Sequence, residues 1–280
     1  MKKILLTLAV ALILVGCTDA RAKIKSSNPL LKVGKTTITG KDLYPYLVEN
    51  FGVDTVTTIV NRYLYEHVVT EKEDFTPKIE EMIEALKAIA GDSYYAMYGL
   101  SSESAFISTM LQEYQLEAVA KVYIADHYDD LCKDYLPAKL AILQFADQKA
   151  ATDALAEAKK GVALTDLAET YGAKTDKYDG SESIYSISSG LSSEVSSYAL
   201  YATQPSIVDS PIAATDSYFY IVQVISVDRS ALKEEISDAF LMDESVYQEA
   251  ILFYCREYKL TYYDKAILNL IYSNNPEYLP

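Results

Sequence analysis

The runs AKLAILQFA (138–146) and SYFYIVQVISVD (217–228) decide the fold of the central part of the chain. Both runs are apolar and rich in the residues that strands favour, so each predicts a β-strand. Asp147 and Thr165 are suited to cap two short helices behind the first strand. A polar loop (173–186) and a third helix (191–202) are expected before the closing strand. This order of elements predicts an α+β chain whose sheet lies in 138–228.

The order of these segments resembles the parvulin-type (PpiC/rotamase) peptidyl-prolyl isomerase domain, and the whole chain looks similar to extracytoplasmic folding factors of the PrsA/SurA type. The closing strand with its following charged helix, the stretch AKKGVALTDLAETYG (158–172) and the segment LSSEV (191–195) carry the resemblance. Parvulins usually have a Met at the start of that last segment and a Phe at its end. The resemblance therefore implies a small antiparallel sheet with helices, and a peptide-binding pocket at Leu191, Val195 and Phe219.

The same resemblance places Ala141 and Tyr220 where parvulins carry their active-site histidines, and makes Asp176 the nearest candidate for their acid. An alanine side chain makes no hydrogen bond, and the Tyr220 hydroxyl projects farther than an imidazole. Of the glycine-rich element that the family often has in the polar loop, only Gly180 remains. These departures favour a scaffold or peptide-binding module, with an active isomerase as the alternative. Whether the domain is an enzyme stays open.

The first seventeen residues have the composition of a signal peptide. Lys2 and Lys3 precede an apolar run that is too short to span a bilayer, and LVGC (14–17) resembles a bacterial lipobox. We expect Cys17 to be the lipid-bearing start of the mature chain, on the extracytoplasmic face of a bacterial membrane. The alternative is an ordinary cleaved signal peptide. Residues 18–28 are polar and are expected to be a tether.

The two flanking segments, 29–137 and 229–280, are expected to be mainly helical. Hairpin strands around Gly34 are followed by a helix capped by Thr39, a helix at 54–69, a helix that begins at Thr76-Pro77 and ends at Gly91, and a long helix from Ser101 or Ser102 to about Tyr135. Behind the central domain we expect two helices, a short strand at 259–262, a helix capped by Asp264 and a loose tail.

These flanking helices are amphipathic, and small chains bury too little surface to be stable alone. We therefore expect 29–137 and 229–280 to form one chaperone domain into which 138–228 is inserted. The strand at 259–262 would pair with the N-terminal hairpin. A cleft lined by Tyr, Met and Leu would hold unfolded segments, and Met82, Met97 and Met110 are either core residues or part of such a surface.

The chain has 25 basic and 40 acidic residues, which argues against binding nucleic acid and favours basic or neutral clients. No metal or other cofactor is expected, since the two histidines, His67 and His127, have no ligand spacing. Cys132 and Cys255 are expected to be separate thiols, with a disulfide as the alternative. The 25 Tyr residues are expected to be mostly half-buried in helices.

The leading hypothesis is a lipid-anchored chaperone or foldase that binds unfolded secreted polypeptides, with the membrane as its second partner. The first alternative is an active peptidyl-prolyl isomerase of the same architecture. The second is a solute-binding lipoprotein, which needs two α/β lobes, although the first 135 residues are almost all helical in pattern. The oligomeric state is open, and a homodimer is compatible with all three.

Overall fold

A computed structural model describes residues 29–280 except Gly34. The fold is α+β, and its contacts divide the described residues into two units, each of which contains an antiparallel sheet. The smaller unit combines residues 29–61 with Cys255–Pro280, and the larger unit is Arg62–Tyr254. Cys17 and the tether expected at 18–28 lie outside the described residues.

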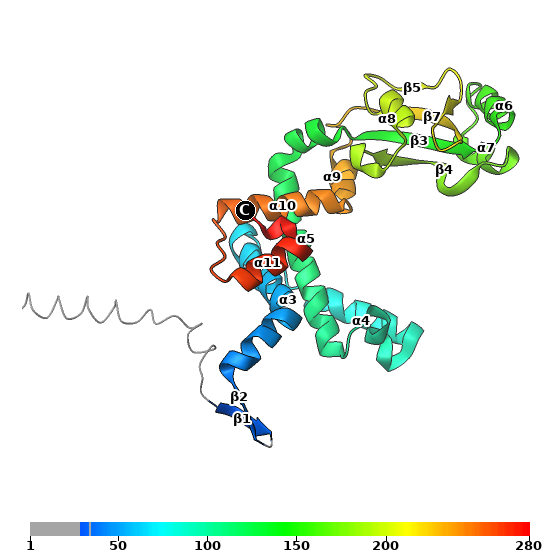
Figure 1. Ribbon diagram of the computed structural model, residues 1–280. Helices are drawn as coiled ribbons and strands as arrows, with labels where there is room; N and C mark the ends of the chain where they lie inside the picture. The colour runs from blue at the N-terminus through cyan, green and yellow to red at the C-terminus, as the bar shows by residue number, and fades with distance from the viewer. Residues whose placement is uncertain (1–28, 34) are drawn as a thin grey trace, which may run out of the picture. The chain divides into compact units, whose positions relative to one another are not determined.

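The smaller unit begins with a two-stranded hairpin and is otherwise helical (Figure 1). In the hairpin, β1 pairs antiparallel with β2. The elements are β1 (Pro29–Val33), β2 (Thr36–Thr39), the first part of α3 (Gly40–Val68), the end of α10 (Glu244–Glu257), α11 (Lys265–Asn274) and the short 3₁₀ helix η3 (Pro276–Tyr278).

Three expectations for the smaller unit are corrected. The predicted helix at 54–69 is the second part of one continuous helix, α3, which contains Pro45 as its sixth residue. The segment 259–262 forms no strand, and Lys259 has a positive φ of 54° directly behind α10. The tail is not loose, because Tyr278 is buried and its hydroxyl donates to Asn61 Oδ1 at 2.7 Å.

The larger unit also holds helices ahead of the central sheet and behind it. Its helical elements outside the central domain are the end of α3, α4 (Thr76–Ala90), the 3₁₀ helix η1 (Gly91–Tyr98), α5 (Glu103–Tyr135), α9 (Lys233–Leu241) and most of α10. As predicted, Ser102 caps α5 by accepting a hydrogen bond from the Ala105 N–H at 3.1 Å. The backbone of α5 departs from helical angles at His127.

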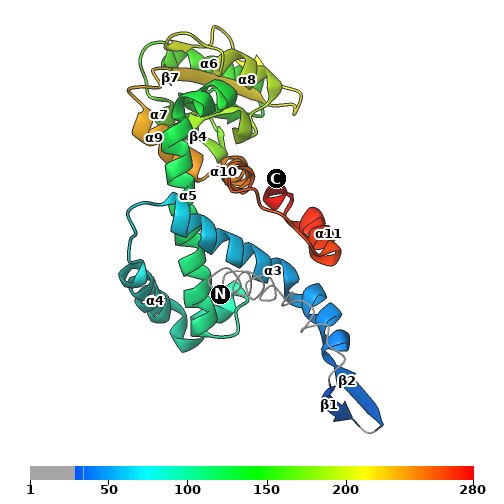
Figure 2. The same ribbon diagram turned by 90° about the vertical axis from the view of Figure 1, so that its left-hand side faces the viewer.

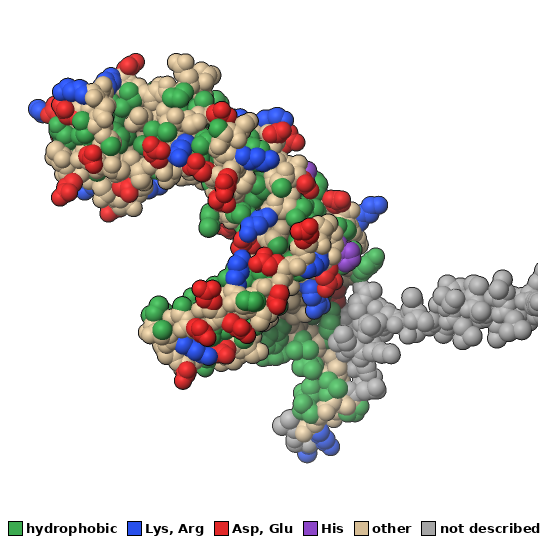
Figure 3. Space-filling view, turned by 180° about the vertical axis from the view of Figure 1, so that it is seen from behind, with side chains coloured by type: hydrophobic (Ala, Val, Ile, Leu, Met, Phe, Trp, Pro, Cys, Tyr) green, Lys and Arg blue, Asp and Glu red, His purple; other side chains and the backbone are tan. Residues whose placement is uncertain are grey.

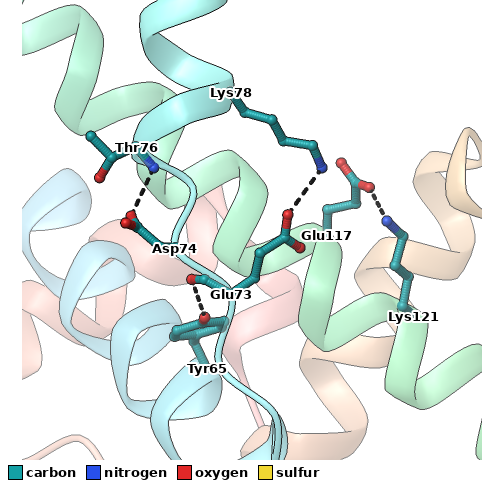
Figure 4. Close-up of polar contacts among 7 residues, drawn as sticks. All are labelled: Tyr65, Glu73, Asp74, Thr76, Lys78, Glu117 and Lys121. Carbon is teal, nitrogen blue, oxygen red and sulfur yellow. Dashed lines mark hydrogen bonds and ion pairs between the residues drawn. The ribbon is translucent and has the colours of Figure 1, made fainter.

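The helix α4 begins at Thr76, as predicted. The Thr76 backbone N–H donates to the Asp74 carboxylate at 3.0 Å, so Asp74 satisfies one donor of the helix start (Figure 4). The same view shows Tyr65, at the end of α3, donating to the Glu73 carbonyl at 3.3 Å. These contacts tie α4 to α3 through the short connection between them.

The central sheet has the strand order β4–β3–β7–β5, with β6 pairing beside β5 along β7, and every pair is antiparallel. Figure 1 shows α6, α7 and α8 gathered about it. The elements are β3 (Ala138–Phe145), α6 (Gln148–Ala158), α7 (Leu164–Thr170), β4 (Lys174–Tyr185), the 3₁₀ helix η2 (Ile187–Ser189), α8 (Ser193–Ala199), β5 (Ser206–Ile207), β6 (Ile212–Ala213) and β7 (Phe219–Ser226).

Two predictions within the central domain are corrected. The expected polar loop is largely the strand β4, whose many charged and hydroxyl side chains suit an exposed edge strand and hide the alternation that would have revealed it. Ala163, and not Thr165, occupies the N-cap position of α7. The predicted cap of α6 is confirmed, since the Asp147 carboxylate accepts from the Ala150 N–H at 2.8 Å.

The boundary between the two units falls within α3 and within α10. The long helix α5 and the C-terminal helices α9 and α10 belong to the unit that contains the sheet. Hydrogen bonds join these helices to one another, because the Tyr128 hydroxyl donates to the Arg229 carbonyl at 2.6 Å. The hydroxyls of Tyr123 and Tyr135 both donate to the Glu249 carboxylate, at 2.8 and 3.0 Å. The insertion of 138–228 into a domain of 29–137 and 229–280 stays a prediction.

Candidate functional site

Tyr220 lies buried on the central strand β7, directly opposite Gln144 of β3. The Gln144 amide donates to the Tyr220 hydroxyl oxygen at 2.6 Å, and the Tyr220 hydroxyl donates to the Asp216 carboxylate. Burial, and then the neighbouring Asp216 carboxylate, raise the pKa of Tyr220 above its ordinary value. The phenol therefore stays protonated, so it can donate a hydrogen bond but cannot act as a base near neutral pH.

Ala141 does not share a face of the sheet with Tyr220. The register pairs Ala141 with Gln223, three residues from Tyr220, and side chains alternate between faces along a strand. The two positions predicted to form one site therefore point to opposite sides of the sheet. Ala141 is therefore not brought together with Tyr220, and a shift of one residue in matching an apolar strand would reverse its faces.

The remaining predicted site residues are also not gathered at Tyr220. Val195 is only 1% exposed and packs in the core with α8, so it offers no surface to a peptide. Leu191 and Phe219 are partly buried and pack against the same core. Asp176 is exposed and lies where β4 bulges away from β3, between the paired residues Lys174 and Asp179.

The sequence reading missed three residues that do meet Tyr220. Besides Gln144 and Asp216, the ring of Tyr178 on β4 stands edge-on to the Tyr220 ring, with 5.8 Å between the centroids. Gln144 is a polar residue within the buried run LAILQF, and that signal could have identified it. Asp216 is only four residues before Tyr220 in the chain, whereas nothing local links Tyr178 to this position, because Tyr178 is brought there by β4.

A second candidate site lies entirely within the smaller unit, where α11 runs beside the first part of α3 (Figure 2). A mostly apolar groove of about 650 Å³ separates the two helices. At its edge the Tyr44 hydroxyl donates to the Asp264 carboxylate at 2.7 Å. The lining side chains come from both helices: Lys41, Tyr44, Pro45, Val48, Glu49, Asp264, Ala266, Asn269, Leu270 and Ser273.

Large apolar side chains also lie on the exposed side of α3. Leu43, Leu47 and Phe51 are exposed and recur every four residues, so they form one stripe along the helix. We call these three residues the α3 stripe. Leu43 and Leu47 directly precede Tyr44 and Val48 of the groove in the chain. The smaller unit therefore carries both a mostly apolar groove and an exposed apolar stripe on the same helix.

Comparison with known proteins gives similarities of structure alone. No protein-family model matches the chain, and no curated protein matches it by sequence. Solved structures of similar arrangement are foldase protein PrsA from Streptococcus pneumoniae (17% identity, TM-score 0.46, covering 87% of this chain and 98% of that one) and the peptidylprolyl isomerase PrsA from Bacillus cereus (16%, 0.45, 88% and 98%). A third is foldase protein PrsA from Lactococcus lactis (17%, 0.41, 88% and 99%).

The chemistry available at Tyr220 is limited to hydrogen bonding. Both histidines of the chain lie in helices outside 138–228, His67 near the end of α3 and His127 in α5. Within the described part of the chain, no group of His, Cys, Asp and Glu side chains is arranged to hold a metal ion. Cys132 and Cys255 are both buried and free, so the expectation of separate thiols is confirmed.

Proposed function

We propose that the chain is a lipid-anchored extracytoplasmic chaperone that binds unfolded secreted polypeptides. The observation that carries the proposal is the apolar surface made by the groove and the α3 stripe. Soluble proteins rarely leave contiguous apolar surface exposed unless it binds something. The sequence supports the location, because an apolar leader precedes LVGC at 14–17. Among the described residues, no helix is both long enough and apolar enough to cross a membrane.

The proposed role for the central domain is that of a scaffold or peptide-binding module with little isomerase activity. The Tyr220 hydroxyl donates its hydrogen to Asp216 and accepts from Gln144, so its hydrogen is not directed at a prolyl amide. Val195 is enclosed in the core. An isomerase needs an apolar pocket for the proline ring together with groups that favour the twisted amide. We expect turnover of a prolyl tetrapeptide to be close to the uncatalysed rate.

A solute-binding lipoprotein is not proposed. That class requires two lobes, each with a sheet covered by helices. The part of the chain that the structure describes has one five-stranded sheet and one hairpin of two strands.

The test of the chaperone function is the suppression of light scattering by an unfolding client protein. The double variant Leu47→Ser with Phe51→Ser should lose most of the suppression, because it makes the α3 stripe polar. Ile187→Ser with Tyr201→Ser is the matched control, since both side chains are exposed apolar groups in the larger unit. Suppression that is absent in the unaltered protein, or equal in the two double variants, would contradict the proposal.

The proposed anchor has its own test. Mass spectrometry of protein from a bacterial host that modifies lipoproteins should show a mature chain that begins at Cys17 with acyl groups. Stable anchoring takes more than one acyl chain, so at least two are expected. An unmodified Cys17, or cleavage at another residue, would remove the lipid anchor from the proposal and leave the chaperone function to the scattering assay.

A further inference from the structure

The end of the arm formed by α4, η1 and the start of α5 exposes more apolar side chain than its packing requires. Ile89 is 80% exposed and Met97 is 68% exposed. Tyr98, Ile107 and Leu111 are also exposed, and all five lie within the consecutive elements α4, η1 and α5. We call these five residues the arm tip. Single exposed apolar residues are common, but five within 23 consecutive residues of three successive helical elements are a higher density than packing requires.

The arm tip is held in shape by buried aromatic residues beneath it. Tyr94 and Phe106 are both fully buried, and their rings meet edge-on with 5.1 Å between the centroids. The Tyr98 ring packs on Phe106 at the same centroid distance, which leaves the rest of Tyr98 facing out. The exposed side chains are therefore presented by a packed support. A preformed surface loses less conformational freedom on binding than a loose loop would.

The charge around the arm tip is strongly negative. Between residues 80 and 113 the only basic side chain is Lys87, and its ammonium group lies 2.7 Å from the Glu103 carboxylate. The remaining carboxylates of that stretch are all exposed: Glu80, Glu81, Glu84, Asp92 and Glu113. Figure 3 shows red carboxylate side chains spread among green apolar ones over this end of the arm.

The lysines of the arm that lie farther from the tip also have carboxylate or carbonyl partners. Lys78 lies 3.5 Å from Glu73, and Lys121 lies 2.5 Å from Glu117 (Figure 4). Lys72 donates to backbone carbonyls at the end of α3. Among the described residues of this arm, no lysine is therefore left to neutralise the carboxylates beside the tip. Their charge is left for a binding partner to complement.

We infer that the arm tip is a second docking surface, specific for unfolded segments in which apolar residues alternate with Lys or Arg. The apolar side chains of such a segment would cover Ile89, Met97 and Tyr98, and its cations would face the surrounding carboxylates. Met and Tyr suit this role, because a flexible thioether and a flat ring adapt to many apolar partners. The inference rests on the proposed chaperone function and adds to it a class of client sequence and a place.

Charge complementarity identifies the class of unfolded segment that the arm tip would bind. An acidic segment would bring like charges together at the tip, and a neutral apolar segment would leave the carboxylates without partners while partly shielding them from water. A basic amphipathic segment satisfies both the apolar and the acidic parts of the surface. Its binding must weaken as salt is added, because exposed charges are screened.

Three short fluorescein-labelled peptides test the inference by fluorescence anisotropy with the purified full chain. They share one pattern of Leu residues, and the intervening positions are Lys in the first, Gln in the second and Glu in the third. We expect the Lys peptide to bind most tightly and the Glu peptide most weakly, with the difference shrinking between about 0.05 and 0.3 M salt. Equal binding of all three peptides would overturn the inference.

Two variants locate the site. Ile89→Ser with Met97→Ser should weaken binding of the Lys peptide, and Glu84→Gln with Asp92→Asn and Glu113→Gln should weaken it about fivefold or more. The matched controls are Met242→Ser, whose side chain is 90% exposed elsewhere, and the neutralisation of three exposed carboxylates outside the arm, Glu169, Asp176 and Asp238. Variants and controls that bind alike would overturn the placement at the arm tip.

The outcomes for the two proposals are separate. If the protein suppresses aggregation through the α3 stripe while the arm-tip variants match their controls, the arm inference is wrong and the chaperone proposal stands. If the Lys peptide binds at the arm tip but no client is kept from aggregating, the surface is confirmed and the chaperone proposal is wrong. Far-UV circular dichroism of each variant shows whether a loss of binding is a loss of fold.

Discussion

Replacing Gly180 with alanine should break the contact between β4 and α7. Gly180 has a φ of +84°, at a point where β4 carries one residue more than β3 between paired positions. A Cβ added here would lie 2.7 Å from the carbonyl carbon of Leu164 and 2.8 Å from the backbone nitrogen of Thr165. Both atoms belong to the backbone at the start of α7, so neither can move aside as the end of a flexible side chain could.

Two costs add at this position. A left-handed backbone costs a non-glycine residue about 1–2 kcal/mol, and overpacking a tight site costs roughly 1–3 kcal/mol more. Gly172→Ala is the matched control, because Gly172 also has a positive φ, +67°, yet an added Cβ there meets no atom within 4 Å. The control should carry only the first cost. The two variants should therefore differ by about 1–3 kcal/mol in the free energy of opening the domain.

The measurement is native-state hydrogen exchange, followed by mass spectrometry on peptides that cover β3 and β7. Exchange reports each region separately, which suits a chain of two units whose unfolding need not be two-state. Protection factors in the Gly180→Ala protein should fall by about fivefold to 150-fold relative to Gly172→Ala. Equal protection in the two variants would show that the close approach of β4 to α7 is not what requires glycine.

The remaining predictions concern buried polar groups. Tyr278→Phe leaves the Asn61 side-chain oxygen without its donor, so the smaller unit should lose about 1–3 kcal/mol; unchanged exchange along the first part of α3 would contradict this. Burial raises the pKa of the Cys132 thiol, and that of the Cys255 thiol to about 12. Both should alkylate far more slowly in the native protein than in urea at pH 8, and rapid native alkylation would refute the burial. Because the folded pKa values are raised, the stability that the neutral thiols contribute is present below their ordinary pKa and is lost as pH rises toward 12. Tyr220→Phe should lower the melting temperature, because it removes the hydroxyl that joins two polar partners, and leave aggregation suppression unchanged; a loss of suppression would give Tyr220 a direct role.

Several elements could be predicted because their signals lie within a few residues. Ser102, Asp147 and Asp264 each accept a backbone N–H two or three residues ahead at a helix start. The strands β3 and β7 could be predicted because both are long apolar runs in the centre of a sheet. The candidate site was harder to predict from the sequence, because it depends on which side of each strand a residue faces.

The sequence by itself determined the class of the fold, the caps of α5, α6 and α11, and the two central strands. Tertiary structure decided that the polar run around Gly180 is an edge strand, that Tyr278 is buried against Asn61, and that Tyr220 meets Gln144 instead of Ala141. The physical reason is how far apart in the sequence the interacting groups lie. A cap is satisfied by groups within one turn of the chain, whereas a strand's register and faces depend on partners far along the sequence. Moving that register by one residue would exchange every side chain between the core and the opposite face.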